Sequence, residues 1–140
     1  MKTKFSFLAL VLVSTLSLYA QQKVPANVIA VFNSKFPNAQ NVKWGKESKT
    51  EYEADFKINT QTMSANFSDQ GAWLETESTI TFDQIPEKVK QAFSTLHPGS
   101  SVKVVEKVES PEGTKFELKI KEKNKSKEIL YSEEGVEIKN

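Results

Sequence analysis

The chain contains one phrase twice, as FSDQGAWLE at residues 67–75 and as YSEEGVEIK at residues 131–139. The likeness extends upstream, where VPANVIAVFNSKFP at residues 24–37 aligns with IPEKVKQAFSTLHP at residues 85–98. The offset is 61 residues in the upstream segment and 64 in the downstream one, so the second copy contains three more residues. A repeat of about 60 residues is marginal as an independent fold. We therefore expect two copies of one structural unit that share a single sheet and core.

Each copy is predicted to begin with a helix. Pro25 and Pro86 suit a first helical turn, where the missing N–H is not needed, and Pro37 and Pro98 end the two segments. Between these prolines, apolar residues recur at the three- and four-residue spacing of one helix face. They are Val28, Val31, Phe32 and Phe36 in the first copy, and Val89, Ala92, Phe93 and Leu96 in the second.

The rest of each copy alternates between apolar and polar residues, as half-buried strands do. In the first copy Tyr52, Ala54 and Phe56 alternate with acidic residues. The pattern predicts four strands per copy, with Leu74 and Ile138 among the residues of the apolar face. The predicted fold class is α+β, a tandem duplication of a helix plus four antiparallel strands in one shared antiparallel sheet. Since only one face is apolar, both helices should cover it and leave the other face open.

The N-terminus has the order of a secretory signal peptide: basic residues, an apolar run and a small residue before the cleavage site. Residues 1–20 are predicted to be this peptide, with cleavage near Ala20. The remainder divides into a first repeat, residues 21–84, and a second repeat, residues 85–140, within one compact domain. The apolar run is shorter than the ~20 residues that span a membrane, and no cysteine is present to carry a lipid. We therefore expect a periplasmic or secreted protein, with no membrane insertion after cleavage.

The composition argues against several classes of function. Without Lys2 and Lys4 the chain carries 17 lysines against 18 acidic residues and no arginine, so nucleic acid is not an expected partner. The absence of cysteine removes thiol nucleophiles and thiolate metal sites. His97, the single histidine, has no nucleophile signalled beside it, and no nucleophile-elbow or phosphate-loop motif occurs. We predict that the protein is not an enzyme and has no catalytic residue, cofactor or metal ion.

Taken together, these segments resemble a known family. The VP helix, FPNAQNVKW, YEADF, ANFSDQGAWLETE, IPEKVKQAF and HPG are, as a set, similar to the beta-lactamase-inhibitor-like, PepSY-like domain proteins. The resemblance runs from Val24 to the C-terminus, and it implies tandem repeats of this kind in an exported bacterial protein. It brings no catalytic or ligand residues, and a shared fold does not carry inhibitor activity with it.

Trp73 is the position at which the two phrases differ most, since Glu137 takes its place in the second copy. Alternation with Leu74 puts Trp73 on the open face of the predicted sheet, where a large aromatic side chain is typical of a protein-binding anchor. The alternative is that Trp73 only covers neighbouring strands. The predicted binding face comprises Trp73, Glu75, Glu77, Glu53, Asp55, Asn66 and Lys43.

The function that these residues predict is binding of an unknown protein or peptide, of which inhibition of an enzyme is one form. The alternative is a small-molecule or divalent-cation site on the acidic strands, at Glu51–Asp55 and Glu75–Glu77, because calcium accepts several carboxylate ligands. Lys43 and Lys57 are close enough in the predicted sheet to pair with these carboxylates. No loop has the dense Asp, Asn and Gly spacing of a calcium site, so the pattern favours a solvated charged face over a metal site.

Overall fold

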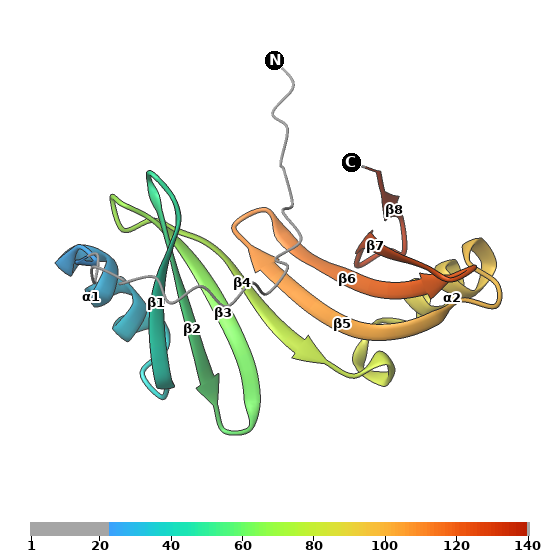
Figure 1. Cartoon of the computed structure of the whole chain (residues 1–140), viewed down its shortest axis with the longest axis horizontal. Helices are drawn as coiled ribbons and strands as arrows, with labels where there is room; N and C mark the ends of the chain where they lie inside the picture. The colour runs from blue at the N-terminus through green and yellow to red at the C-terminus, as the bar shows by residue number, and fades with distance from the viewer. Residues whose placement is uncertain (1–22, 140) are drawn as a thin grey trace, which may run out of the picture.

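The structure is a computed structural model that describes residues 23–139 (Figure 1). The first repeat contains α1 (Ala26–Lys35), β1 (Gln40–Ser48), β2 (Glu51–Ile58), β3 (Gln61–Ser68) and β4 (Trp73–Ile80). The 3-10 helix η1 (Phe82–Gln84) leads to α2 (Glu87–Leu96), β5 (Ser101–Ser110), β6 (Gly113–Glu122), β7 (Lys125–Ser132) and β8 (Glu137–Ile138). The predicted fold class is thus confirmed, because each repeat is one helix followed by four antiparallel strands.

The predicted signal peptide, residues 1–20, lies outside the described residues. Among the residues that the structure does describe, no helix has both the length and the apolar character that a membrane span requires.

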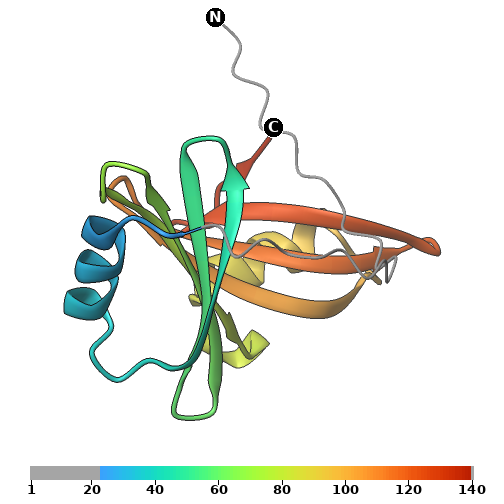
Figure 2. The same ribbon diagram turned by 60° about the vertical axis from the view of Figure 1, so that its left-hand side comes forward.

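All eight strands form one antiparallel sheet in chain order, from β1 to β8. The sheet passes from the first repeat to the second through β4 and β5, where Ile80 lies opposite Val105. Residues directly opposite each other share a face, and the register keeps one apolar face continuous from β2 to β7. Both helices pack on this face. The sheet is strongly twisted (Figure 1, Figure 2). Because each helix packs on the strands of its own repeat, α1 and α2 lie near opposite ends of the molecule.

The two helices begin and end in the same way, as the aligned prolines predict. The carbonyl of Pro25 accepts hydrogen bonds from the first turn of α1, and the carbonyl of Pro86 does the same for α2. At the other end, the N–H of Phe36 donates to Phe32 at 2.8 Å, and the N–H of His97 donates to Phe93 at 2.9 Å. Each helix therefore presents the same two-turn apolar stripe to the sheet.

The core is divided into two clusters, one under each helix. Under α1, Val28 and Phe32 pack against the apolar residues of β2 and β3. Under α2, Val89 and Phe93 pack against those of β5, β6 and β7. Each repeat thus buries its own helix, and the shared sheet joins the two clusters. Because both helices pack on one face of the sheet, the opposite face is free to bind a partner.

Tyr131 is the counterpart of Phe67, and it is fully buried. Its hydroxyl oxygen has no hydrogen-bond partner in the described part of the chain, and burial raises the pKa of this hydroxyl to about 12. We expect Tyr131→Phe to increase the free energy of unfolding by about 1 kcal/mol, because a buried unpaired hydroxyl costs about 1–3 kcal/mol. Urea unfolding measures this change. The control Tyr52→Phe, at a half-buried site, should change stability by less than about 0.5 kcal/mol; a loss of stability in Tyr131→Phe would contradict the prediction.

Candidate functional site

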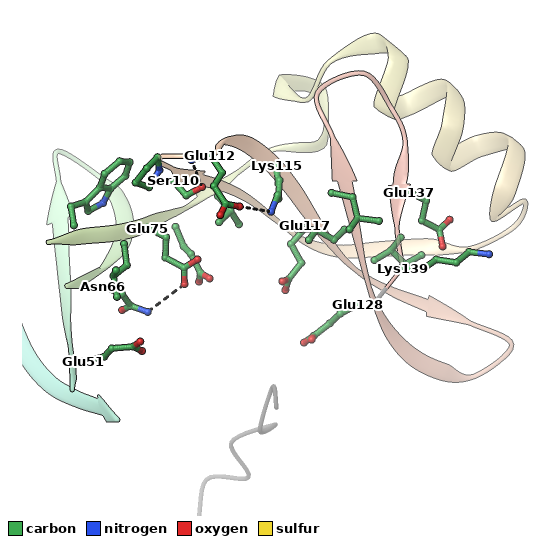
Figure 3. A pocket seen from close by; sticks show the side chains of 18 residues that line it. Glu51, Asn66, Glu75, Ser110, Glu112, Lys115, Glu117, Glu128, Glu137 and Lys139 are labelled. Carbon is green, nitrogen blue, oxygen red and sulfur yellow. Dashed lines mark hydrogen bonds and ion pairs between the residues drawn. The ribbon is translucent and has the colours of Figure 1, made fainter. Parts of the chain in front are cut away.

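The open face of the sheet contains a groove with a cavity volume of about 970 Å³. Residues of β2 to β8 line it, so both repeats contribute. In Figure 3 the side chains of Glu51, Glu75, Glu117 and Glu128 point into the same hollow from the two halves of the sheet. We call this feature the open-face groove. Its acidic lining residues, apart from Glu137, are Glu51, Glu75, Glu77, Glu112, Glu117 and Glu128.

The residues predicted for the binding face divide into two groups. Those that border the open-face groove are Trp73, Glu75, Glu77 and Asn66. The other three, which lie toward the β1 edge and outside the groove lining, are Glu53, Asp55 and Lys43. The structure therefore places the hollow of the open face nearer the middle of the sheet, with most of its lining residues in the second repeat.

The prediction that Trp73 projects from the open face is wrong. Trp73 lies directly opposite Phe67, which is fully buried under α1, so both belong to the helix-covered face. The register between β3 and β4 is irregular at this point, because the next pair is Asn66 with Glu75 and Leu74 is the extra residue. An extra residue in one strand breaks the two-residue alternation. Glu75 is therefore on the open face although Trp73, two residues earlier, is not.

The contacts of Trp73 show what its side chain does on the helix-covered face. Its indole N–H donates to the hydroxyl oxygen of Thr76 at 2.9 Å, and Thr76 is buried. The ammonium group of Lys35, the last residue of α1, lies 3.6 Å from the centroid of the indole ring. This geometry is a cation–π contact. Trp73 thus holds the end of α1 against β4, although the residue also borders one side of the open-face groove.

Glu137 performs the corresponding task in the second repeat. It lies opposite the buried Tyr131, and its carboxylate is 3.1 Å from Nε2 of His97 at the end of α2. Nδ1 of His97 is 3.1 Å from the carboxylate of Glu122, so both ring nitrogens face an acceptor. Ile138 consequently lies opposite Leu130 on the open face, and its predicted place on the apolar face is wrong.

Trp73 and Glu137 therefore differ because the helix ends that they meet differ. The first repeat places a lysine above the aromatic ring, whereas the second places a histidine beside the carboxylate. Both pairs join the C-terminal end of a helix to the last strand of its repeat. Both ring nitrogens of His97 contact carboxylates, those of Glu122 and Glu137. His97 does not line the open-face groove.

Glu77 has the most perturbed ionisation in the groove. Burial, followed by repulsion from Glu106, Glu75 and Glu117, raises the pKa of its carboxyl group to about 7. Lys119 opposes the rise. A carboxylate that is partly desolvated and surrounded by other carboxylates favours its protonated form. Glu77 is therefore a group whose charge changes near neutral pH.

The pKa values of other carboxyl groups on the open face are raised as well. Burial is the largest cause of the raised pKa of Glu75, Glu117 and Glu53, and neighbouring carboxylates add to it. Asn66 partly offsets this for Glu75 by donating a hydrogen bond of 3.4 Å to its carboxylate. The negative charge of the groove is therefore only partly offset by positively charged side chains nearby.

Sequence reasoning missed the contribution of the second repeat to the groove. Glu117 is 8% exposed, and it pairs with Lys119 at 3.7 Å. Val108 and Leu130 add apolar surface on the same face. Alternation of Glu117 with Phe116 and Leu118 is the signal for its face. This alternation does not show that Glu117 lies near Glu77. Their proximity depends on the order of β4, β5 and β6 in the sheet.

The alternative predicted for the acidic strands is a divalent-cation site. Within residues 23–139, no three histidine, aspartate or glutamate side chains come together as a ligand set for a metal ion. The carboxylates of the groove instead spread over several strands. The alternative of a divalent-cation site on Glu51–Asp55 and Glu75–Glu77 therefore gains no geometric support in the described region.

Comparison with known proteins identifies relatives of this chain. Residues 15–63 and 50–139 match the family described as "Putative beta-lactamase-inhibitor-like, PepSY-like". No curated protein matches the chain. The two matched segments together cover most of its length, in agreement with a tandem arrangement.

Several solved structures from Bacteroides species have the same fold. A protein of Bacteroides eggerthii, described as putatively periplasmic, is 23% identical, with 84% of this chain and 87% of that chain covered and a TM-score of 0.77. A DUF2874 family protein of Bacteroides uniformis is 27% identical, with 82% and 86% covered and a TM-score of 0.76. A BLIP-like protein of Bacteroides fragilis is 22% identical, with 86% of each chain covered and a TM-score of 0.76.

Proposed function

Because this chain belongs to the beta-lactamase-inhibitor-like, PepSY-like family, we propose that it is an exported, non-enzymatic module that binds a protein or peptide in its open-face groove. The observation that carries the proposal is the groove itself, a cavity of about 970 Å³ on the sheet face that neither helix covers. The core does not require this face to be hollow or acidic, since both helices pack on the other side. A concave surface that mixes apolar and charged groups is the usual form of a binding site.

Two further observations support a binding role in an exported protein. The solved relative from Bacteroides eggerthii is described as a "putative periplasmic" protein, and the N-terminal residues of this chain have the order of a signal peptide. The family description and the BLIP-like relative point to an inhibitor-like module. We therefore place the protein in the periplasm or outside the cell, with an extracytoplasmic protein as its partner.

Charge reversal in the groove tests this proposal. We expect the protein, without residues 1–20, to retain a partner from a periplasmic extract, and Glu77→Lys with Glu117→Lys to lose at least about 90% of it. Two reversed charges at a partly buried binding surface cost several kcal/mol of binding free energy. Mass spectrometry of the retained material measures the loss.

The control carries the same change in charge away from the groove. Glu87 on α2 and Glu133 in the turn before β8 are exposed and do not line the groove. The double variant Glu87→Lys and Glu133→Lys should retain the partner as the unmodified protein does. If both double variants retain it equally, the groove is not the binding site and the proposal fails.

A further inference from the structure

We infer that the segment bound in the open-face groove is an extended, lysine- or arginine-rich peptide that also carries apolar side chains. This inference rests on the proposed function of the same groove and specifies the chemistry of its partner. It follows from the charge of the groove, from the apolar side chains between those charges, and from the spread of the groove across the sheet.

The charge of the groove is predominantly negative and incompletely paired. Six glutamates line it apart from Glu137, which is turned toward His97, against Lys115 and Lys139. Lys115 lies 4.0 Å from Glu112, and Lys119 is shared between Glu106 at 3.1 Å and Glu117 at 3.7 Å. The groove carboxylates that have no ion pair within residues 23–139 are Glu51, Glu75, Glu77 and Glu128. A positively charged partner complements this surface.

The arrangement of the carboxylates favours several linked cations over one ion. Glu51 is on β2, Glu75 and Glu77 are on β4, and Glu128 is on β7. One metal ion cannot contact groups on strands that are this far apart, since adjacent strands are about 4.8 Å from each other. A chain with a cationic side chain at intervals can reach them in turn.

Apolar side chains between the acidic ones distinguish a peptide from a simple polycation. Val108 lies directly opposite Glu77, and Leu130 lies directly opposite both Glu117 and Ile138. A surface that contacts only water would not need apolar residues in its groove. Their contact with leucine-like side chains would remove apolar surface from water, which is favourable.

The width of the groove indicates the length of the segment. Its lining extends from β2 to β8, which is six interstrand steps or about 29 Å along the sheet. An extended chain advances about 3.3 Å per residue. A segment of about nine residues is therefore long enough to contact the whole groove.

Binding of such a segment should depend on pH through Glu77. Its carboxylate carries its full charge only above its pKa of about 7, so the groove becomes more negative as the pH rises from 6 to 8. A bound cation that lowers this pKa by about one unit would strengthen binding about fivefold over that range. The groups around Glu77 are Glu75 on β4, Glu106 on β5, and Glu117 and Lys119 on β6, and the residue opposite it on β3 is the uncharged Ser64.

Titration calorimetry of the mature protein with synthetic peptides tests the inference. The probe is a nine-residue peptide with lysine at positions 1, 5 and 9, leucine at positions 3 and 7 and serine elsewhere, so that an extended chain presents both kinds of side chain on one face. The comparison peptides replace each lysine by glutamine or by glutamate. At pH 8 and low salt we expect the lysine peptide to bind at least about tenfold more tightly than the glutamine peptide, and the glutamate peptide not to bind. Spermine, which has the cations without leucine side chains, should bind more weakly than the lysine peptide.

Two variants assign the effect to the groove. Glu77→Gln should weaken binding of the lysine peptide about ninefold at pH 8 and remove most of its pH dependence between pH 6 and 8. Glu87→Gln, outside the groove, should change neither. Equal binding of the lysine and glutamine peptides, no binding of the lysine peptide, or equal binding of spermine would overturn the inference. The proposed function survives any of these results if the charge-reversed groove still loses its partner from the extract, so the two failures are distinguishable.

Discussion

Phe32→Ala is expected to reduce the free energy of unfolding by about 3–5 kcal/mol, the usual cost of removing a buried phenylalanine. Phe32 is 2% exposed and lies at the centre of the cluster under α1. Its ring centroid is 5.1 Å from those of Trp44 and Phe56, 5.4 Å from that of Phe36 and 6.1 Å from that of Phe67. Since α1 contacts the sheet through so few buried residues, this loss should affect the whole first repeat.

Urea unfolding of the protein without residues 1–20 measures this loss, and a helix variant provides its control. Leu96 of α2 is 54% exposed, so Leu96→Ala should cost less than about 1 kcal/mol. Because domains of this size have about 5–15 kcal/mol of stability in total, Phe32→Ala should shift the unfolding midpoint far more than Leu96→Ala. Similar midpoints for the two variants would show that the cluster under α1 does not contribute as its geometry indicates.

Gly135→Ala is expected to be the most destabilising of the glycine substitutions, at about 2–5 kcal/mol. Gly135 has a φ of 81°, a conformation that residues with a Cβ rarely adopt. A Cβ at this position would also lie 2.5 Å from the backbone oxygen of Lys88, in the first turn of α2. Either the turn or the helix would have to move, and backbone cannot yield as a side chain can.

Substitutions at two other glycines distinguish the cost of the steric clash from the cost of the positive φ. Gly99 has a φ of 77°, and a Cβ added there would have nothing within 4 Å, so Gly99→Ala should cost only about 1–2 kcal/mol. Gly71, the counterpart of Gly135, would place its Cβ 3.2 Å from the side-chain nitrogen of Asn27, which can rotate away. Urea midpoints should therefore fall furthest for Gly135→Ala. A midpoint equal to that of Gly99→Ala would exclude the contact with Lys88 as a source of destabilisation.

The candidate site can be predicted only in part from the sequence. Alternation assigns Asn66, Glu75 and Glu77 to the open face, and all three border the groove. The same rule assigns Trp73 to that face, but Trp73 is on the other one, because Leu74 is an extra residue between two strand pairs. A single inserted residue reverses the face of every residue on one side of it, and side-chain type gives no warning of the insertion.

The difference between the two copies of the repeated phrase also has another meaning in the structure. On sequence grounds, Trp73 against Glu137 indicates a functional divergence, since the shared residues of the phrase account for the turn and the core. In the structure, each of the two residues contacts the end of its own helix, at Lys35 in one repeat and at His97 in the other. The two positions differ together with their helix ends because the pairs are in contact across the fold, which a comparison of linear segments cannot reveal.

The repeat, the fold class, the two helices and most of the buried residues can be read from the order of amino acids alone. These properties are local, because helix and strand periods and the preference of apolar side chains for the interior are recorded in consecutive residues. The face of Trp73, the partner of Glu137 and the gathering of Glu75, Glu77 and Glu117 in one hollow are properties of the folded chain. They depend on strand register, on the extra residue at Leu74 and on the twist of a sheet shared by both repeats, which arise only when distant segments pair.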